Sequence, residues 1–88
     1  MRVELRGTIR AALGTTALEV DVPASGVPLS QLLDAIAAAN PRARGYLGPT
    51  LSEAVLRPVH NGTLLPPGED PLVQPDDRLL LIHAVAGG

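Results

Sequence analysis

A single segment of this chain carries an extended helical repeat, and this feature most limits the folds open to it. From Leu29 to Ala37 apolar residues recur at spacings of three and four, and no Gly or Pro interrupts the run before Asn40-Pro41 ends it. The other apolar residues alternate with polar ones or form short runs, as strands do. Because one helix covers one face of a sheet, the sequence predicts an α+β domain with a second sheet face left for function.

Two alternating segments predict the first strands. In Met1–Gly7, Val3 and Leu5 alternate with charged residues, and Ala17–Val22 repeats this pattern. The connection Thr8–Gly14 predicts a turn, or one helical turn, that Gly14 ends. So short a connection favours antiparallel pairing of the two strands.

The second half predicts a hairpin and a last strand. Asn61-Gly62 is the preferred dipeptide of a two-residue type I′ turn, so Val55–Leu65 is interpreted as a hairpin. Pro58 has no N–H to donate, so we expect it at an edge, a bulge or a strand end. Arg78–Val85 is nearly continuously apolar. Such a strand is either covered on both faces or presents an apolar stripe to a partner.

Connections are predicted at three places. Pro28 stands where Ser or Thr would normally cap the helix, so Ser30 is placed in its first turn. Residues 41–52 are interpreted as a loop, with Tyr46 and Leu47 folding back onto the core. Residues 66–68 and 71–77 are expected to form turns.

Composition excludes several kinds of chemistry. The chain has 88 residues, of which 45% are hydrophobic, so we expect one domain with a modest core. It has no Cys, which excludes disulfides, zinc fingers and thiol nucleophiles, and its basic residues are all Arg, which excludes Schiff-base chemistry. A net charge of −2 does not favour nucleic-acid binding, and no apolar run is long enough for a membrane helix. No metal-ligand cluster and no signal peptide are recognisable, so a cytoplasmic location is expected.

The last residues stand apart from the rest. Gly87 and Gly88 carry no side chain, so this end can thread a narrow channel and carry its carboxylate to a remote reactive centre. A frayed end is the alternative reading. We therefore divide the chain into a domain, 1–83, and a flexible tail, 84–88.

The whole pattern resembles the ubiquitin-like β-grasp sulfur carriers, which include the molybdopterin synthase small subunit and the thiamin sulfur carrier. The resemblance rests on the order of elements, the Asn61-Gly62 hairpin, the segment Asp76–Leu79 before the last strand, and the end Ala84-Val85-Ala86-Gly87-Gly88. The segment Ile9–Gly14 resembles the turn after the first strand in the molybdopterin synthase type. The resemblance implies a mixed sheet of four to five strands with one main helix packed on one face.

The resemblance also implies a mechanism in which the chain is a co-substrate and not an enzyme. A partner resembling ubiquitin-activating enzymes, using ATP and Mg²⁺, would adenylate Gly88, while Val85, Ala86 and Gly87 thread into its active site. A persulfide enzyme would then convert the adenylate into a thiocarboxylate, and a synthase subunit or other biosynthetic enzyme would accept the sulfur. No cofactor is expected on this chain. The receiving pathway stays open between molybdopterin, thiamin, cysteine and thio-natural-product biosynthesis.

Strand parity suggests where those partners dock. If Val3 and Leu5 face the helix, Arg6 faces outward, and on the last strand Leu79 and Leu81 face inward. The outward residues are then Arg6, Leu80 and Ile82, with Leu64 of the hairpin extending the patch. The alternative is that these apolar residues belong to the core, because a register slip inverts every side chain.

The other polar candidates have plain interpretations. His60 and His83 have no neighbouring ligand residues in sequence, so each is expected to be a solvent-exposed histidine at a strand end. Asp76-Asp77 is interpreted as a turn before a strand, without a catalytic partner. Arg10 either anchors the tail or a partner, or forms a surface ion pair.

Two other classes of function stay open. One is a protein modifier that is conjugated through Gly88 to substrate lysines in the manner of ubiquitin. The other is a ubiquitin-like interaction module that uses only its sheet face.

Overall fold

The computed structural model describes residues 1–43, 56–66 and 68–83. In chain order its elements are β1 (Arg2–Gly7), α1 (Thr8–Leu13), β2 (Ala17–Glu19), β3 (Val27–Pro28), α2 (Leu29–Ala39), the 3-10 helix η1 (Pro41–Ala43), β4 (Leu56–His60), β5 (Thr63–Leu64), β6 (Leu72–Val73) and β7 (Leu79–His83). The loop expected over 41–52 begins with η1. The predicted positions of Tyr46 and Leu47 lie outside the described residues.

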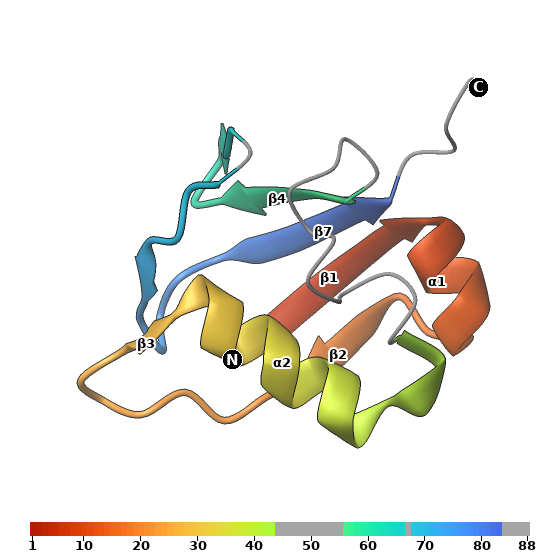
Figure 1. Cartoon of the computed structure of the whole chain (residues 1–88), viewed down its shortest axis with the longest axis horizontal. Coiled ribbons are helices and arrows are strands. Elements are labelled where there is room, and N and C mark those ends of the chain that lie inside the picture. The colour runs from red at the N-terminus through yellow and green to blue at the C-terminus, as the bar shows by residue number, and fades with distance from the viewer. Residues whose placement is uncertain (44–55, 67, 84–88) are drawn as a thin grey trace.

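Five of the strands form one mixed sheet in the order β2-β1-β7-β4-β5. The first strand pairs antiparallel with β2, as predicted, and parallel with β7, whose other neighbour is β4 (Figure 1). The last strand of the chain is therefore the central strand of the sheet. This mixed sheet with one long helix confirms the predicted α+β, β-grasp fold.

The core lies between α2 and the inner face of the sheet (Figure 1). The predicted helix is confirmed over Leu29–Ala39, and its apolar residues are buried as the spacing requires. Val3 and Leu5 from β1 and Leu79 and Leu81 from β7 meet it with at most 2% of their surface exposed. The predicted alternation of inward and outward side chains therefore holds on both β1 and β7. The buried core consists of Val3, Leu5, Ile9, Leu29, Leu32, Leu33, Ile36, Leu56, Val73, Leu79 and Leu81.

The start of α2 is capped from a distant part of the chain. Pro28 is the N-cap residue and offers no side-chain hydrogen bond, as the sequence indicated. The free backbone N–H groups of the first turn are instead satisfied by residues 70 and 71: Ser30 donates its N–H to Asp70 at 2.7 Å, and Leu29 donates to the Pro71 carbonyl at 2.9 Å. The Ser30 hydroxyl donates to the second Asp70 oxygen, also at 2.7 Å. A carboxylate forty residues away thus fixes the helix start.

The hairpin is confirmed in its turn type. Asn61 and Gly62 both have positive φ angles, 51° and 84°, as a type I′ turn requires. The prediction for Pro58 was wrong: it lies in the middle of β4, between β7 and the short strand β5. The Pro58 carbonyl accepts a hydrogen bond from the Leu65 N–H on the β5 side. The backbone N and O of one residue in an antiparallel strand point to the same side, so the N–H that proline lacks would not have bonded to β7.

The helical turn predicted within Thr8–Gly14 is present as the short helix α1, and Gly14 ends it, as predicted, with a left-handed φ of 69°. Two other segments differ from the prediction. The second strand ends at Glu19 rather than Val22, although Val20 still donates to the Met1 carbonyl at 2.9 Å. Within the expected turn 71–77, Leu72–Val73 forms β6 and pairs with β3. This two-residue pairing has no period that a sequence pattern could reveal.

Candidate functional site: the outer sheet surface

The sheet face opposite α2 carries the residues predicted to dock partners. The register places Arg6 beside Ile82 and Glu4 beside Leu80, all with parity opposite to the buried core residues. Leu64 pairs with Val59 on the same face, and 49% of its surface is exposed. The structure therefore brings the four predicted residues, Arg6, Leu64, Leu80 and Ile82, to one face. This face is here called the outer sheet surface, and its residues are Arg2, Glu4, Arg6, Arg57, Val59, Leu64, Arg78, Leu80 and Ile82.

Two cross-strand rows organise this surface. One row runs Glu4, Leu80, Val59, Leu64 and is mainly apolar. The next row lies two residues further along β7 and consists of Arg6, Ile82 and Arg57. Arg57 and Val59 were not predicted as site residues. Counting back from the Asn61-Gly62 turn gives their shared face, but only the pairing of β4 with β7 places them beside Leu80 and Ile82.

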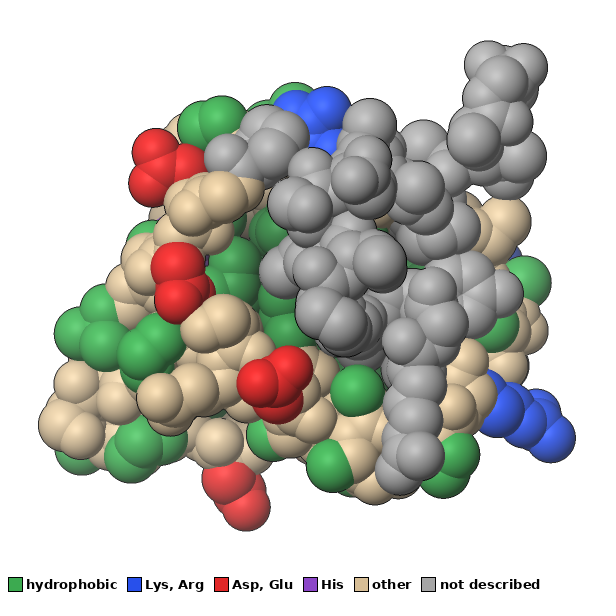
Figure 2. Space-filling model, in the orientation of Figure 1, with side chains coloured by type: hydrophobic (Ala, Val, Ile, Leu, Met, Phe, Trp, Pro, Cys, Tyr) green, Lys and Arg blue, Asp and Glu red, His purple; other side chains and the backbone are tan. Residues whose placement is uncertain are grey.

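The charges of the molecule are unevenly distributed. Of the six arginines that the structure describes, four lie on the outer sheet surface: Arg2, Arg6, Arg57 and Arg78. Among the described residues, acidic groups on the same face include Glu4 and Glu19, the latter across from Arg2 on β2, and Asp77 lines a hollow there with Arg2 and Arg78. On the opposite, α2 side, both acidic side chains and arginines show, the arginines near the margins of the view (Figure 2). A chain of net charge −2 thus presents a basic rim around an apolar centre on one face.

The chain leaves the sheet at one end of this surface. The final pairs of β7 join His83 to Gly7 on β1 and to Leu56 on β4, directly after the row of Arg6, Ile82 and Arg57. Residues 84–88 follow in sequence. The predicted tail residues Val85, Ala86, Gly87 and Gly88 lie outside the described residues, so their roles and the boundary at 83 stay predictions.

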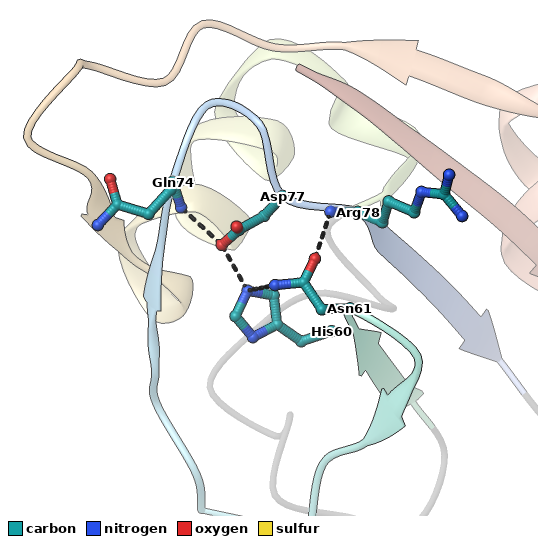
Figure 3. A network of polar contacts seen from close by, with 5 residues as sticks. All are labelled: His60, Asn61, Gln74, Asp77 and Arg78. Carbon is teal, nitrogen blue, oxygen red and sulfur yellow. Dashed lines mark hydrogen bonds and ion pairs between the residues drawn. The ribbon is translucent and has the colours of Figure 1, made fainter.

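One histidine is not the exposed residue that the sequence predicted. The Nε2 atom of His60 lies 2.7 Å from Oδ2 of Asp77, and about 15% of the His60 side chain is exposed. The same Asp77 oxygen accepts the Gln74 N–H at 2.8 Å, while Arg78 donates its N–H to Asn61 Oδ1, also at 2.8 Å (Figure 3). These contacts tie the hairpin turn to the start of β7.

The acidic pair forms the predicted turn before β7, and within it Asp77 has structural contacts with Gln74 and His60. The pKa of Asp77 lies below its ordinary value of 3.8, mainly because the carboxylate accepts the Gln74 N–H and, to a smaller extent, because it pairs with the His60 ring. A carboxylate held ionised by structural contacts is unsuited to proton transfer at neutral pH. The side chain of His83 lies outside what the structure describes.

Arg10 is exposed on α1, and within the described residues it forms no ion pair. The described residues also hold no group of three or more His, Cys, Asp or Glu side chains placed to bind a metal ion. None of the described helices has the length and apolar character needed to cross a membrane.

Comparison with known proteins places this fold in a family. A family model described as the ThiS family matches residues 3–88, nearly the whole chain. The chain belongs to the ThiS family. No curated protein sequence matches this ThiS-family chain well enough to count as a relative.

Solved structures share the fold of this ThiS-family chain. SAMP1 from Haloferax volcanii has 24% sequence identity and a TM-score of 0.75, with 99% of this chain and 97% of that chain covered. The small archaeal modifier protein 1 from Methanosarcina acetivorans has 22% identity, a TM-score of 0.72, and coverage of 99% and 94%. A molybdopterin converting factor subunit 1 from Pyrococcus furiosus has 17% identity, a TM-score of 0.71, and coverage of 96% and 95%.

Proposed function

We propose that this ThiS-family chain is a sulfur carrier whose Gly88 carboxylate is converted to a thiocarboxylate. The observation that carries the proposal is the family match, which runs through the Gly-Gly end to residue 88. The fold supports it, because β7 ends at His83 and residues 84–88 are all small apart from Val85. A chain without Cys or Lys has no thiol or side-chain amine to intercept an activated Gly88.

The chemistry proceeds through an acyl adenylate. A carboxylate oxygen of Gly88 attacks the α-phosphorus of ATP on the activating enzyme, and pyrophosphate leaves. A sulfur nucleophile then attacks the Gly88 carbonyl carbon and AMP leaves. If a persulfide enzyme supplies the sulfur, a thiol must cleave the resulting acyl disulfide to release the thiocarboxylate. ATP and Mg²⁺ are bound by the partner, and the carrier contributes the acyl group and a docking surface.

A mass measurement tests this proposal. The chain is incubated with the adenylating enzyme encoded in the same genome, Mg²⁺, ATP and sulfide, and the intact protein is weighed. We expect the mass gain of one oxygen replaced by sulfur, located by fragmentation at Gly88. A variant lacking Gly88 is the control and should gain nothing. An unchanged mass of the full chain in the presence of active enzyme would overturn the proposal.

A second candidate is protein modification through the same activated Gly88. Its support is the structural similarity to proteins titled as small archaeal modifier protein 1. Here a substrate lysine amine, rather than sulfur, would displace AMP. Adding tagged protein to an extract of the source cells distinguishes the two, since conjugates that need both ATP and Gly88 favour the modifier. If the full chain forms neither a thiocarboxylate nor conjugates but still binds partner proteins, an interaction module is favoured instead.

A further inference from the structure

The row of Arg6, Ile82 and Arg57 combines two cations with an apolar residue at a particular place. These residues lie on three neighbouring strands, each directly across from the next. Strands are about 4.8 Å apart, so the two arginine backbones are about 10 Å apart with Ile82 between them. The row is the last on this face before His83, where the chain leaves the sheet.

Arg57 is the unusual member of this row. Its side chain is partly buried, and among the described residues its Nε is the one buried side-chain nitrogen or oxygen without a hydrogen-bond partner. A buried donor without an acceptor costs free energy, so such groups are rare in folded proteins unless something satisfies them. Arg6, by contrast, is exposed and has no ion pair within the described part of the chain.

We infer that Arg6 and Arg57 are specificity-determining residues that bind carboxylates of the adenylating partner on either side of an apolar contact with Ile82. The inference rests on the proposed function for the identity of the partner. Guanidinium groups pair with carboxylates through two parallel hydrogen bonds, which fixes orientation as well as charge. The partner surface is therefore acidic with an apolar centre.

The position of the row explains why orientation matters here. The reacting carboxylate of Gly88 is five residues beyond His83 in sequence, and it must reach the nucleotide. Two bidentate contacts beside the point where the chain leaves the sheet would fix the direction in which residues 84–88 enter the enzyme. The rim residues Arg2 and Arg78 lie at the other end of this face, beside Leu80, and add a longer-range attraction.

Kinetics of the adenylation step test the assignment. Arg6→Glu, Arg57→Glu and the charge-neutral Arg6→Gln and Arg57→Gln are compared with wild type in ATP–pyrophosphate exchange. The matched control is Arg42→Glu, the same charge change on η1, an exposed position next to α1 and α2. We expect the KM for the carrier to rise about tenfold or more in the Arg6 and Arg57 variants, with kcat unchanged within about twofold. Thermal unfolding verifies that each variant is folded, and Arg6, being exposed, preserves the test if Arg57 variants unfold.

Salt dependence provides a second readout. Binding of wild type to the enzyme, measured by calorimetry, should weaken as NaCl rises, and the Arg6→Gln/Arg57→Gln double variant should depend on NaCl less steeply. If the Arg6 and Arg57 variants were adenylated with the same KM as the wild type and the Arg42 control, this inference would be overturned and the proposed function would be left intact. Failure of the wild type to be adenylated would overturn the proposed function, and this inference with it.

Discussion

At the level of single residues, Asp77 shows how one carboxylate joins separate parts of the chain. It accepts the Gln74 N–H across the turn before β7, and it pairs with His60 at the end of β4. The residue pattern predicts the turn, because Pro75 and two acidic residues precede an apolar run. The His60 contact could not be predicted, since it depends on β4 and β7 being neighbours with His60 across from Leu79.

The replacement Asp77→Asn should therefore lower stability in a pH-dependent way. Because contacts with the Gln74 N–H and His60 lower the pKa of Asp77 in the folded state, its ionised form stabilises the fold above the unfolded-state pKa near 3.8. That contribution is lost as the pH falls through the lowered folded-state value. At pH 7 we expect Asp77→Asn to reduce the free energy of unfolding by about 1 kcal/mol.

Urea unfolding of both proteins between pH 7 and pH 3 measures this difference. The gap between wild type and variant should narrow at the acidic end, where Asp77 itself becomes neutral. Asp76→Asn, at the exposed neighbouring residue, is the matched control and should show little gap at any pH. A gap for Asp77→Asn that stays constant down to pH 3 would mean that the charge of Asp77 does not stabilise the fold.

At the level of elements, the sequence predicts the features that depend on adjacent residues and does not predict those that depend on long-range contacts. The helix α2 and the Asn61-Gly62 turn were predicted because periodicity and φ preferences are properties of adjacent residues. The cap of α2 by Asp70 and the pairing of β3 with β6 were not, because each joins segments forty or more residues apart that no local pattern connects. Both lie at the same end of α2, where Leu29 also donates to Pro71.

Removing this cap should destabilise α2 at its first turn. In Asp70→Ala the Ser30 N–H and hydroxyl both lose their acceptor, so we expect the free energy of unfolding to fall by about 1 kcal/mol. The neighbouring Glu69→Ala, also exposed and of the same charge, is the control and should be nearly neutral. Hydrogen exchange of the Ser30 amide provides the local measurement. Unchanged protection of this amide in Asp70→Ala would contradict the assigned cap.

For the molecule as a whole, the order of strands joins stability to function. The chain's last strand is the centre of the sheet, so the end that would react leaves from the most firmly held element rather than from an edge. The sequence predicted one helix, a covered face and an outward face. It did not predict the row of Arg6, Ile82 and Arg57, because that row exists only once parallel pairing of β7 with β1 sets the register.

This arrangement predicts that the tail can be removed without loss of the fold. The described core lies entirely within residues 3–81, and the pairs of β7 end at His83. A chain ending at residue 83 should therefore keep its free energy of unfolding within about 0.5 kcal/mol of the full chain while losing adenylation completely. Leu81→Ala alters the core and leaves the tail intact. Because Leu81 is fully buried, this variant should lower the free energy of unfolding by about 3 kcal/mol.

Thermal and urea unfolding of these two variants separate the contributions of tail and core. If the truncated chain unfolded as easily as Leu81→Ala, residues 84–88 would be part of the packed domain, and the boundary at 83 would be wrong. If it kept its stability and still bound the adenylating enzyme, the outer sheet surface would act independently of the group it delivers. Docking by the sheet and reaction at Gly88 would then be separable functions of one chain, joined only through the end of β7.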